Sequence, residues 1–426
     1  MVSGGAVAPG WDHPQAMGAA EQAQTIDDAQ RVSPRDVAAL LESFAGRGAG
    51  TDAERRASWW LAHLLNRRGR RVSIETFWCR PNWALAQAWH VGLALAGSLV
   101  SVAIPRAGGA MLLAALVFIL ADALTGVSPG RRLTRERASQ NVVVTRAKSQ
   151  PEGTHLIVTA NYDAGRAGLA YRDPLRELTS RARRGLAGFT IGWLGWLIVA
   201  IVWLLVTSIV RVEGHHSAGI GAIQLIPTVG LLVALALLLE LAAAAWSPGA
   251  GDNGSGVGVA VAVARAVSTS PPRNLSVEVV LTGAGDSQGA GLRHHLRQRR
   301  RTHRAANTVV LGIAPSPSGS VRWWRSDGPL LPLRYGARLV QLARRVADEQ
   351  PQLGARRHDG RGSSPALPAR QARIPSLAIG CLDERDLAPG SHQPTDVAGA
   401  LDRAAHDQTV QFALMLIDAI DAALAR

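Results

Sequence analysis

Four long apolar runs interrupt an otherwise mixed pattern of polar and apolar positions. They span about 88–105, 109–127, 186–210 and 218–245. Each is close to the roughly 20 residues that a helix needs to cross a bilayer. The runs form two pairs joined by short turns, so each pair returns the chain to the side that it left. We therefore predict two transmembrane hairpins, at 88–127 and 186–246, in preference to buried hairpins of a soluble protein.

The first apolar pair is less regular than the second. Pro105 shortens one run, and Asp122 lies inside the other. A carboxylate at this depth is either a partnered intramembrane group or a residue close to an interface. We expect Asp122 to lie near the interface.

Outside these runs, helical and strand-like patterns alternate. Ser33 and Pro34 are typical of a helix start, and Thr51 with Glu54 predicts a capping box for a second helix. Further strands are predicted at 71–78, 141–144, 155–160, 276–282, 308–313 and 374–380, and further helices at 256–267, 290–301, 330–349 and 404–425.

This alternation predicts an α/β fold, a three-layer sandwich with a mixed, mostly parallel sheet, interrupted by the two transmembrane helical hairpins. The predicted soluble domain is discontinuous and combines 31–87, 128–185 and 247–426. Residues 1–30 lack a signal-peptide pattern and are predicted to be a disordered tail.

The distribution of charge indicates an orientation in the membrane. The net charge is +14, and arginines crowd the flanks of the runs on the side of the soluble segments. The two hairpin turns carry only Arg106 and Arg211. The positive-inside bias therefore predicts a multi-pass protein of the cell membrane with its soluble domain and N-terminus in the cytoplasm.

Two further features narrow the possible partners and chemistry. The basic run 293–304 is expected to face solvent or the lipid bilayer, and no nucleic-acid partner is expected. Cys79 and Cys381 are too few and too far apart for a disulfide framework or a cysteine-based zinc site.

Polar, glycine-rich loops follow several predicted strands, at the edge where α/β folds bind ligands. They are NYDAG (161–165), GAGDNGSG (249–256) and GAGDSQG (283–289), with HQPTD (392–396) after the last strand. In order and composition these pieces resemble the co-catalytic zinc aminopeptidase family, which includes bacterial leucyl aminopeptidases, glutaminyl cyclases and nicastrin. The resemblance spans about 33–80, 138–165 and 247–425.

The resemblance implies two zinc ions bridged by a carboxylate, with a glutamate as general base. Most of the implied positions hold other residues in this chain. Asn161 replaces the histidine of a His-x-Asp triplet whose aspartate remains as Asp163, and Gly251 is at the bridging position beside Asp252. Gly285 replaces the general base beside Asp286, Val309 replaces a later aspartate, and His392 is kept.

These replacements predict a domain that has lost most metal ligands. No zinc is expected, and His392 and Asp286 are the only candidates for a weakly bound metal ion. The favoured interpretation is a membrane-bound pseudopeptidase, not an enzyme, that binds a peptide terminus or a partner protein or acts as a scaffold. The alternative is an active hydrolase, either an atypical metallo-aminopeptidase or a serine hydrolase.

The serine alternative depends on GDSQG (285–289). This segment fits Gly-x-Ser-x-Gly between a predicted strand and a predicted helix. Ser287, then Asp383 or Asp386, then His392 would form the triad. An ordinary loop serine is the competing interpretation, and it is favoured because no oxyanion segment is visible.

Overall fold

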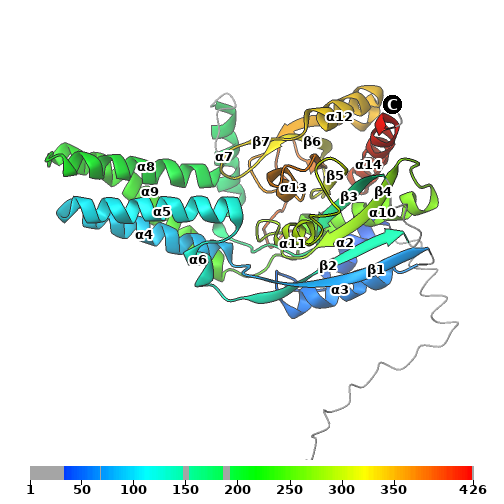
Figure 1. Ribbon diagram of the computed structural model, residues 1–426, viewed down its shortest axis with the longest axis horizontal. Helices are drawn as coiled ribbons and strands as arrows, with labels where there is room; N and C mark the ends of the chain where they lie inside the picture. The colour runs from blue at the N-terminus through cyan, green and yellow to red at the C-terminus, as the bar shows by residue number, and fades with distance from the viewer. Residues whose placement is uncertain (1–32, 68, 147–152, 186–191, 425–426) are drawn as a thin grey trace, which may run out of the picture.

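The computed structural model describes residues 33–67, 69–146, 153–185 and 192–424. The predicted disordered tail at 1–30 lies outside these ranges. In the described part, a globular α/β unit lies at one end of the molecule and a bundle of long helices extends from it (Figure 1).

The α/β unit is built on a nine-stranded mixed sheet with the order β1-β2-β4-β3-β5-β9-β6-β7, in which β8 pairs with β6. Strands β4, β3, β5 and β9 form a parallel centre, and antiparallel pairs flank it. The strands are β1 (Arg70–Cys79), β2 (Arg137–Arg146), β3 (Thr154–Asn161), β4 (Leu275–Thr282), β5 (Thr308–Ile313), β6 (Ser320–Asp327), β7 (Leu333–Arg334), β8 (Arg356–Asp359) and β9 (Ser376–Leu382).

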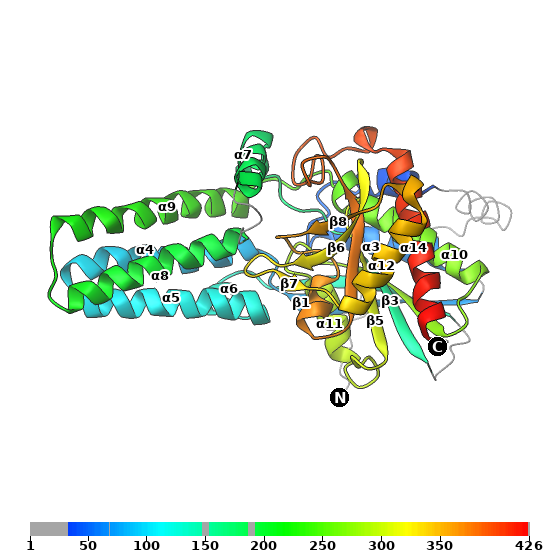
Figure 2. The same cartoon turned by 90° about the horizontal axis from the view of Figure 1, so that it is seen from above.

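Helices cover both faces of this sheet (Figure 2). One face packs against α2 (Pro34–Glu42), α3 (Asp52–Leu65), α10 (Gly256–Thr269), α12 (Ala337–Glu349) and α14 (Arg403–Leu424). The other face packs against the shorter α11 (Ala290–Gln298) and α13 (Leu367–Gln371). Successive residues of a strand point to opposite faces, so Val142 and Val144 join the larger core while Val143 joins the smaller one. The three-layer α/β fold with a mixed sheet is confirmed.

Four helices are long and apolar enough to cross a membrane. They are α4 (Trp83–Ala103), α5 (Pro105–Thr125), α8 (Trp193–Val212) and α9 (Ala218–Ala243), and they pack around a shared apolar core (Figure 1). The pair α4 and α5 is inserted between β1 and β2, and the pair α8 and α9 between β3 and α10. Both pairs therefore leave the α/β unit and return to it.

Most predicted elements are present, with different bounds in places. Helix α12 begins only at Ala337, because Leu333 and Arg334 pair with β6 as strand β7. Strands β6 and β8, the short helix α6 (Pro129–Arg132) and helix α7 (Asp173–Gly185) were not predicted.

The predicted capping box of α3 is only half correct. Thr51 Oγ1 accepts a hydrogen bond from Glu54 N, as expected. The Glu54 carboxylate instead accepts hydrogen bonds from Gly50 N, Ser139 Oγ and Ala284 N. Glu54 therefore connects α3 to the sheet and to the loop after β4.

Candidate functional site

A pocket of about 380 Å³ lies at the carboxyl edge of the parallel strands. It is lined by the ends of β3, β4, β5 and β9 and by the loops that follow them, which is where open α/β sheets bind ligands. Trp83 and Trp193, the first residues of α4 and α8, also line it, and their rings lie 5.3 Å apart. The pocket therefore lies beside the ends of the long apolar helices.

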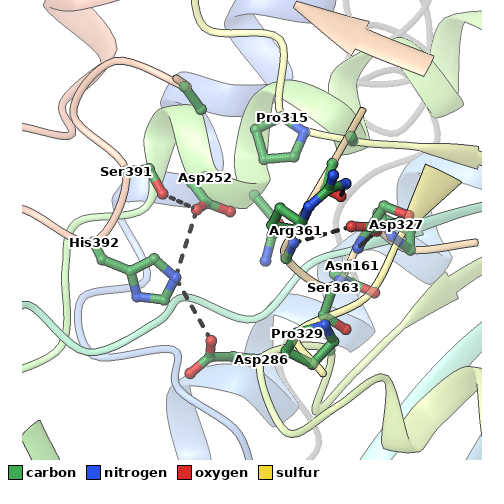
Figure 3. Close-up of a pocket in the computed structure, with 18 of the residues that line it drawn as sticks. Asn161, Asp252, Asp286, Pro315, Asp327, Pro329, Arg361, Ser363, Ser391 and His392 are labelled. Carbon is green, nitrogen blue, oxygen red and sulfur yellow. Dashed lines mark hydrogen bonds and ion pairs between the residues drawn. The ribbon is translucent and has the colours of Figure 1, made fainter. Parts of the chain in front are cut away.

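Asp252, Asp286 and His392 converge in this pocket (Figure 3). His392 Nε2 lies 3.7 Å from Asp252 Oδ2 and 3.6 Å from Asp286 Oδ1. The three side chains come from the loop before α10, the loop after β4 and the loop after β9. His392 is more than one hundred positions from either aspartate, and the three loops lie together because the parallel strands end at the same edge.

The imidazole of His392 is fixed in orientation. Its Nδ1 lies 3.1 Å from the carbonyl oxygen of Arg166, and its ring stacks on Tyr171 with centroids 4.2 Å apart. A histidine that donates Nδ1–H to a carbonyl keeps Nε2 free as a ligand atom. Burial works against protonation, but the carboxylates of Asp286 and Asp252 outweigh it and raise the pKa of His392.

The carboxylates of Asp396 and Asp163 hold in place the loops that carry Asp252 and Asp286. Asp396 accepts hydrogen bonds from Gly251 N (2.6 Å) and Asp252 N (3.0 Å). Asp163 accepts hydrogen bonds from Gly285 N (2.8 Å) and Asp286 N (3.0 Å). The resemblance implied that Asp163 orients an imidazole, but in this chain its carboxylate orients the loop that carries Asp286.

A buried arginine anchors the loop that leads to Asp252. Arg47 is fully buried, and it donates hydrogen bonds to the carbonyl oxygens of Tyr162, Leu41, Pro248 and Gly249. Burial lowers the pKa of Arg47 to about 10. No sequence signal singled out Arg47, because its role depends on carbonyls from two distant segments as well as from nearby Leu41.

The structure changes the assignment of the position next to Asp252. A Cβ atom built on Gly251 would lie 2.5 Å from Asp396 Oδ1, so a carboxylate at 251 would point away from the pocket. The carboxylate of Asp252 faces His392 instead. The prediction that Gly251 removes the carboxylate from the centre of the site is therefore wrong.

Val309 is also not part of the site. It pairs with Leu156 near the start of β3, whereas the pocket lies beyond Asn161 at the end of that strand. Ala314 and Pro315, which follow β5, line the pocket at the corresponding edge. Neither residue offers a side-chain ligand.

Asn161 and Gly285 occupy the part of the site where the resemblance implied a histidine and a general base. Asn161 Oδ1 accepts a hydrogen bond from Thr282 Oγ1 (2.8 Å). A Cβ atom on Gly285 would lie 2.1 Å from Asn161 Cγ, so the asparagine fills the space in which a larger residue at 285 would begin. The described residues therefore give this side of the pocket an amide and no carboxylate.

The predicted serine triad is not assembled. Ser287 Oγ accepts a hydrogen bond from Arg131 Nη1 (3.3 Å) and lies 3.5 Å from the carbonyl oxygen of Arg80. The carboxylate of Asp383 accepts hydrogen bonds from amides of its own loop, and Asp386 pairs with Arg322. His392 faces the two pocket aspartates, so Ser287 has no base.

Two of the three donor separations suit one metal ion. Ligand atoms about 2.0–2.1 Å from a tetrahedral Zn²⁺ lie about 3.3 Å apart, and the separations of 3.6 and 3.7 Å from His392 Nε2 are close to that value. The three donor atoms are not all within 4.8 Å of one another, so the two carboxylates would have to close around an ion. The carboxylates of Asp286 and Asp252, which raise the pKa of His392, also favour the binding of a cation. Asn161 and Ala314 supply no carboxylate or imidazole, so the donor set does not fit a second ion.

Comparison with known proteins agrees with this arrangement. Residues 238–417 match the family model of Peptidase family M28. The matched residues include Asp252, Asp286 and His392, and strands β1 to β3 lie outside the matched range. No curated protein matches the chain in sequence.

Solved structures show the same fold. A zinc aminopeptidase from Bacillus subtilis superposes with a TM-score of 0.52 at 13% identity, over 91% of this chain and 94% of that one. A leucine aminopeptidase precursor from Bacteroides thetaiotaomicron gives 0.51 at 13% identity, over 92% and 97%. A glutaminyl cyclase from Bacteroides thetaiotaomicron gives 0.50 at 13% identity, also over 92% and 97%. At identities this low, the similarity shows a shared fold and leaves the activity open.

Proposed function

We propose that this chain is a membrane-anchored M28 domain that holds one divalent metal ion and binds the amino terminus of a peptide without hydrolysing it efficiently. The observation that carries the proposal is that His392 Nε2 lies within 3.7 Å of a carboxylate oxygen of both Asp252 and Asp286. The proposal differs from the sequence-based expectation of a metal-free pocket because Asp252 adds a third donor.

Three ligands from the protein leave one position of a tetrahedral ion open. A bound Zn²⁺ would supply an electrophilic centre for an amino or carbonyl group at that position. The protein's own residues would hold the ion, position it through Asp163 and Asp396, and enclose it beneath Tyr171.

The lining of the pocket suits a peptide amino terminus followed by an apolar side chain. Four aspartates line it, Asp252, Asp286, Asp327 and Asp386, together with the indole rings of Trp83, Trp193 and Trp324. The amino group would bind the open position of the ion as a neutral amine, and aromatic faces bind apolar side chains.

Weak or absent hydrolysis follows from the missing base. Asp327 accepts hydrogen bonds from the backbone amides of Gly328, Gly362 and Ser364, and Asp386 pairs with His358 and Arg322. Gly285 has no side chain. Among the described residues that line the pocket, each carboxylate is thus either a proposed metal ligand or already engaged, so none is free to take a proton from water.

Metal content of the purified full-length protein tests the metal site. We expect Asp286→Ala and His392→Gln to contain one zinc ion per chain fewer than the wild type after dialysis against dilute zinc. Asp383→Asn is the matched control, because Asp383 caps its own loop outside the pocket. Unchanged zinc content in folded Asp286→Ala and His392→Gln would refute the metal site.

Peptide binding, followed by the fluorescence of the pocket tryptophans, tests the ligand. A peptide with a free amino terminus is expected to bind about tenfold more tightly than its acetylated form, a difference of about 1.4 kcal/mol. Zinc removal should abolish this preference. Equal binding of both peptides would refute the proposed ligand, and Asp286-dependent cleavage of aminoacyl substrates would establish the hydrolase alternative.

A further inference from the structure

A second cluster of potential metal ligands lies between the sheet and α11, away from the pocket at the strand ends. Glu278 is in β4, His295 is in α11 and His303 is in the loop that follows α11. Their exposed fractions are 7%, 0% and 8%. Glu278 pairs with Ile157, four residues or about 13 Å before the strand end at Asn161, so the cluster is separate from Asp252, Asp286 and His392.

The position of Glu278 is unusual for a carboxylate. The core beneath α11 and α13 includes the apolar side chains of Val143, Ile157 and Val280 from the sheet and of Leu292 from α11. Burying an ionised carboxylate among such side chains is costly unless a cation or several hydrogen bonds compensate it. The residues around Glu278 therefore have to supply positive charge or hold a cation.

The ligand atoms of this cluster are spaced as around a metal ion. Glu278 Oε2 lies 3.5 Å from His295 Nε2 and 3.2 Å from His303 Nε2, and all three atoms lie within 4.8 Å of one another. Edges of about 3.3 Å are expected around a tetrahedral zinc ion. Both Nε2 atoms are buried and make no hydrogen bond of acceptable geometry. Two buried ligand atoms without a partner thus face one carboxylate oxygen.

A second layer of contacts holds these ligands in place. His295 Nδ1 lies 3.2 Å from Glu75 Oε2, an arrangement that directs Nε2 of the same ring toward the cluster. Arg299 pairs with Glu75 Oε1, its Nη1 lies 3.1 Å from His295 Nδ1, and its Nε lies 3.9 Å from Glu278 Oε1. The two carboxylates and one guanidinium leave a net negative charge when the histidines are neutral.

The His155 ring, from β3, completes the surroundings. It meets His303 edge to face, with centroids 5.1 Å apart, and closes the cluster on the sheet side. Glu75 and Glu278 lie beside the His295 ring, with carboxylate oxygens 3.2 and 3.5 Å from its Nδ1 and Nε2. The surroundings thus favour a positive charge between the rings, whether carried by a proton or by a metal ion.

We propose that Glu278, His295 and His303 bind one divalent transition-metal ion, best matched by Zn²⁺, which fastens α11 and the basic loop 299–307 to β4. Two imidazoles and one carboxylate are typical zinc donors, and they leave the fourth position to solvent. Loop 299–307 lies between α11 and β5, and α11 itself follows the loop that carries Asp286. This ion would therefore stabilise the segment that leads away from the pocket, and the proposal is independent of the proposed function.

Zinc stoichiometry in paired variants tests this site. We expect His303→Gln and Glu278→Gln each to lose one zinc ion per chain, both in the wild-type protein and in Asp286→Ala. His294→Gln is the matched control, because His294 is adjacent to His295 but stacks on Phe77 and should keep full zinc content. Asp286→Ala alone should lose only the pocket ion, so failure of one site leaves the other test intact.

Thermal unfolding gives a second measurement. Zinc that binds only the folded state raises its melting temperature. In the Asp286→Ala background, zinc should raise the melting temperature of the protein with an intact cluster and of His294→Gln, and should not raise that of His303→Gln. Unchanged zinc content and an unchanged zinc response in His303→Gln and Glu278→Gln would overturn the proposal and leave a cluster of buried ion pairs.

Discussion

At the scale of single residues, Glu54 is the carboxylate that links the first helices to the candidate site. It is fully buried, and Ala284 N, at the start of the loop that carries Asp286, donates to its Oε1 at 2.9 Å. Burial raises the pKa of Glu54 to about 7, although hydrogen bonds from Gly50, Ala284 and Ser139 oppose the shift. The folded state therefore holds a proton that an unfolded chain releases at lower pH.

This raised pKa predicts a loss of stability as the pH increases. The contribution of Glu54 is fully present below about pH 4.5, and it is lost as the pH rises through about 7. Between about pH 5 and pH 8, the melting temperature of the wild type should fall by several degrees relative to that of Glu54→Gln, which cannot ionise. Differential scanning fluorimetry of the detergent-solubilised protein measures this difference.

An exposed glutamate provides the control for this measurement. Glu349→Gln, at the end of α12, should follow the wild type at each pH. A difference between the wild type and Glu54→Gln that stays constant from about pH 5 to pH 8 would contradict the assignment.

The predictions from the sequence differ most from the structure in the roles of single residues. The sequence predicts that the loop 249–256 is part of the site, and Asp252 and Asn253 of this loop line the pocket. The sequence does not show which of its neighbouring positions faces the pocket. That depends on Asp396, which binds the amides of Gly251 and Asp252 and turns the Asp252 side chain inward. Arg47 and Glu54 were missed for the same reason, since their partners lie on distant segments.

At the scale of elements, the strands with strong apolar patterns were predicted and the weak ones were not. Strand β9 is buried along its whole length, whereas β8 is four residues long and mostly polar, Arg356 to Asp359. Strand β6 carries arginines at 322 and 325 and is recognisable only from its pairing with β9. A short or polar strand owes its conformation to its neighbours, and its own sequence therefore carries little signal.

An ion pair connects the first apolar hairpin to the candidate site. Arg131, in α6, makes a two-pronged contact with Asp122 near the end of α5, with distances of 2.7 and 2.9 Å. Arg131 Nη1 also donates to Ser287 Oγ, and Gln288 Nε2 lies 3.3 Å from Asp122 Oδ2. Asp122 therefore lies close to the α/β unit, where it is also a partnered carboxylate.

Breaking this pair should be costly. The side chains of Asp122 and Arg131 are 0% and 8% exposed, so Asp122→Leu leaves a buried guanidinium without its partner. We expect a loss of about 3–5 kcal/mol in the free energy of unfolding. The double variant Asp122→Leu/Arg131→Met should be more stable than Asp122→Leu alone, measured by urea unfolding in detergent.

A neighbouring arginine gives the matched control for the double-variant cycle. Arg132→Met removes an exposed arginine and should change stability little. If the losses of stability caused by Asp122→Leu and by Arg131→Met simply add in the double variant, the Asp122–Arg131 contact does not stabilise the protein.

At the scale of the whole molecule, the surface of the helix bundle differs from that of the α/β unit. Helices α4, α5, α8 and α9 have 20 to 26 residues, or about 30–39 Å at 1.5 Å per residue. Large apolar side chains such as Leu99, Val117, Val206 and Leu232 are at least half exposed on them. Soluble monomers rarely expose apolar surface on this scale, which supports the proposed insertion in a membrane.

The proposed orientation in that membrane follows from the same arrangement. Both hairpins begin and end at the α/β unit, so their turns should lie together on the opposite side of the bilayer (Figure 1). Under the positive-inside bias, the arginine-rich flanks at the α/β unit predict that this unit would face the cytoplasm. The pocket would then open beside the inner membrane surface, within reach of peptides on the cytoplasmic side.

Cysteine labelling in whole cells tests this orientation. His215→Cys lies in the exposed turn between α8 and α9, and Arg300→Cys lies in the basic loop after α11. Each variant also carries Cys79→Ser, which removes the partly exposed native cysteine. The other native cysteine, Cys381, is buried and should not react. A membrane-impermeant maleimide should label His215→Cys in intact cells, and Arg300→Cys only after permeabilisation. The reverse pattern would invert the proposed orientation, and equal labelling of both in intact cells would contradict an arrangement in which the bilayer separates the turns from the α/β unit.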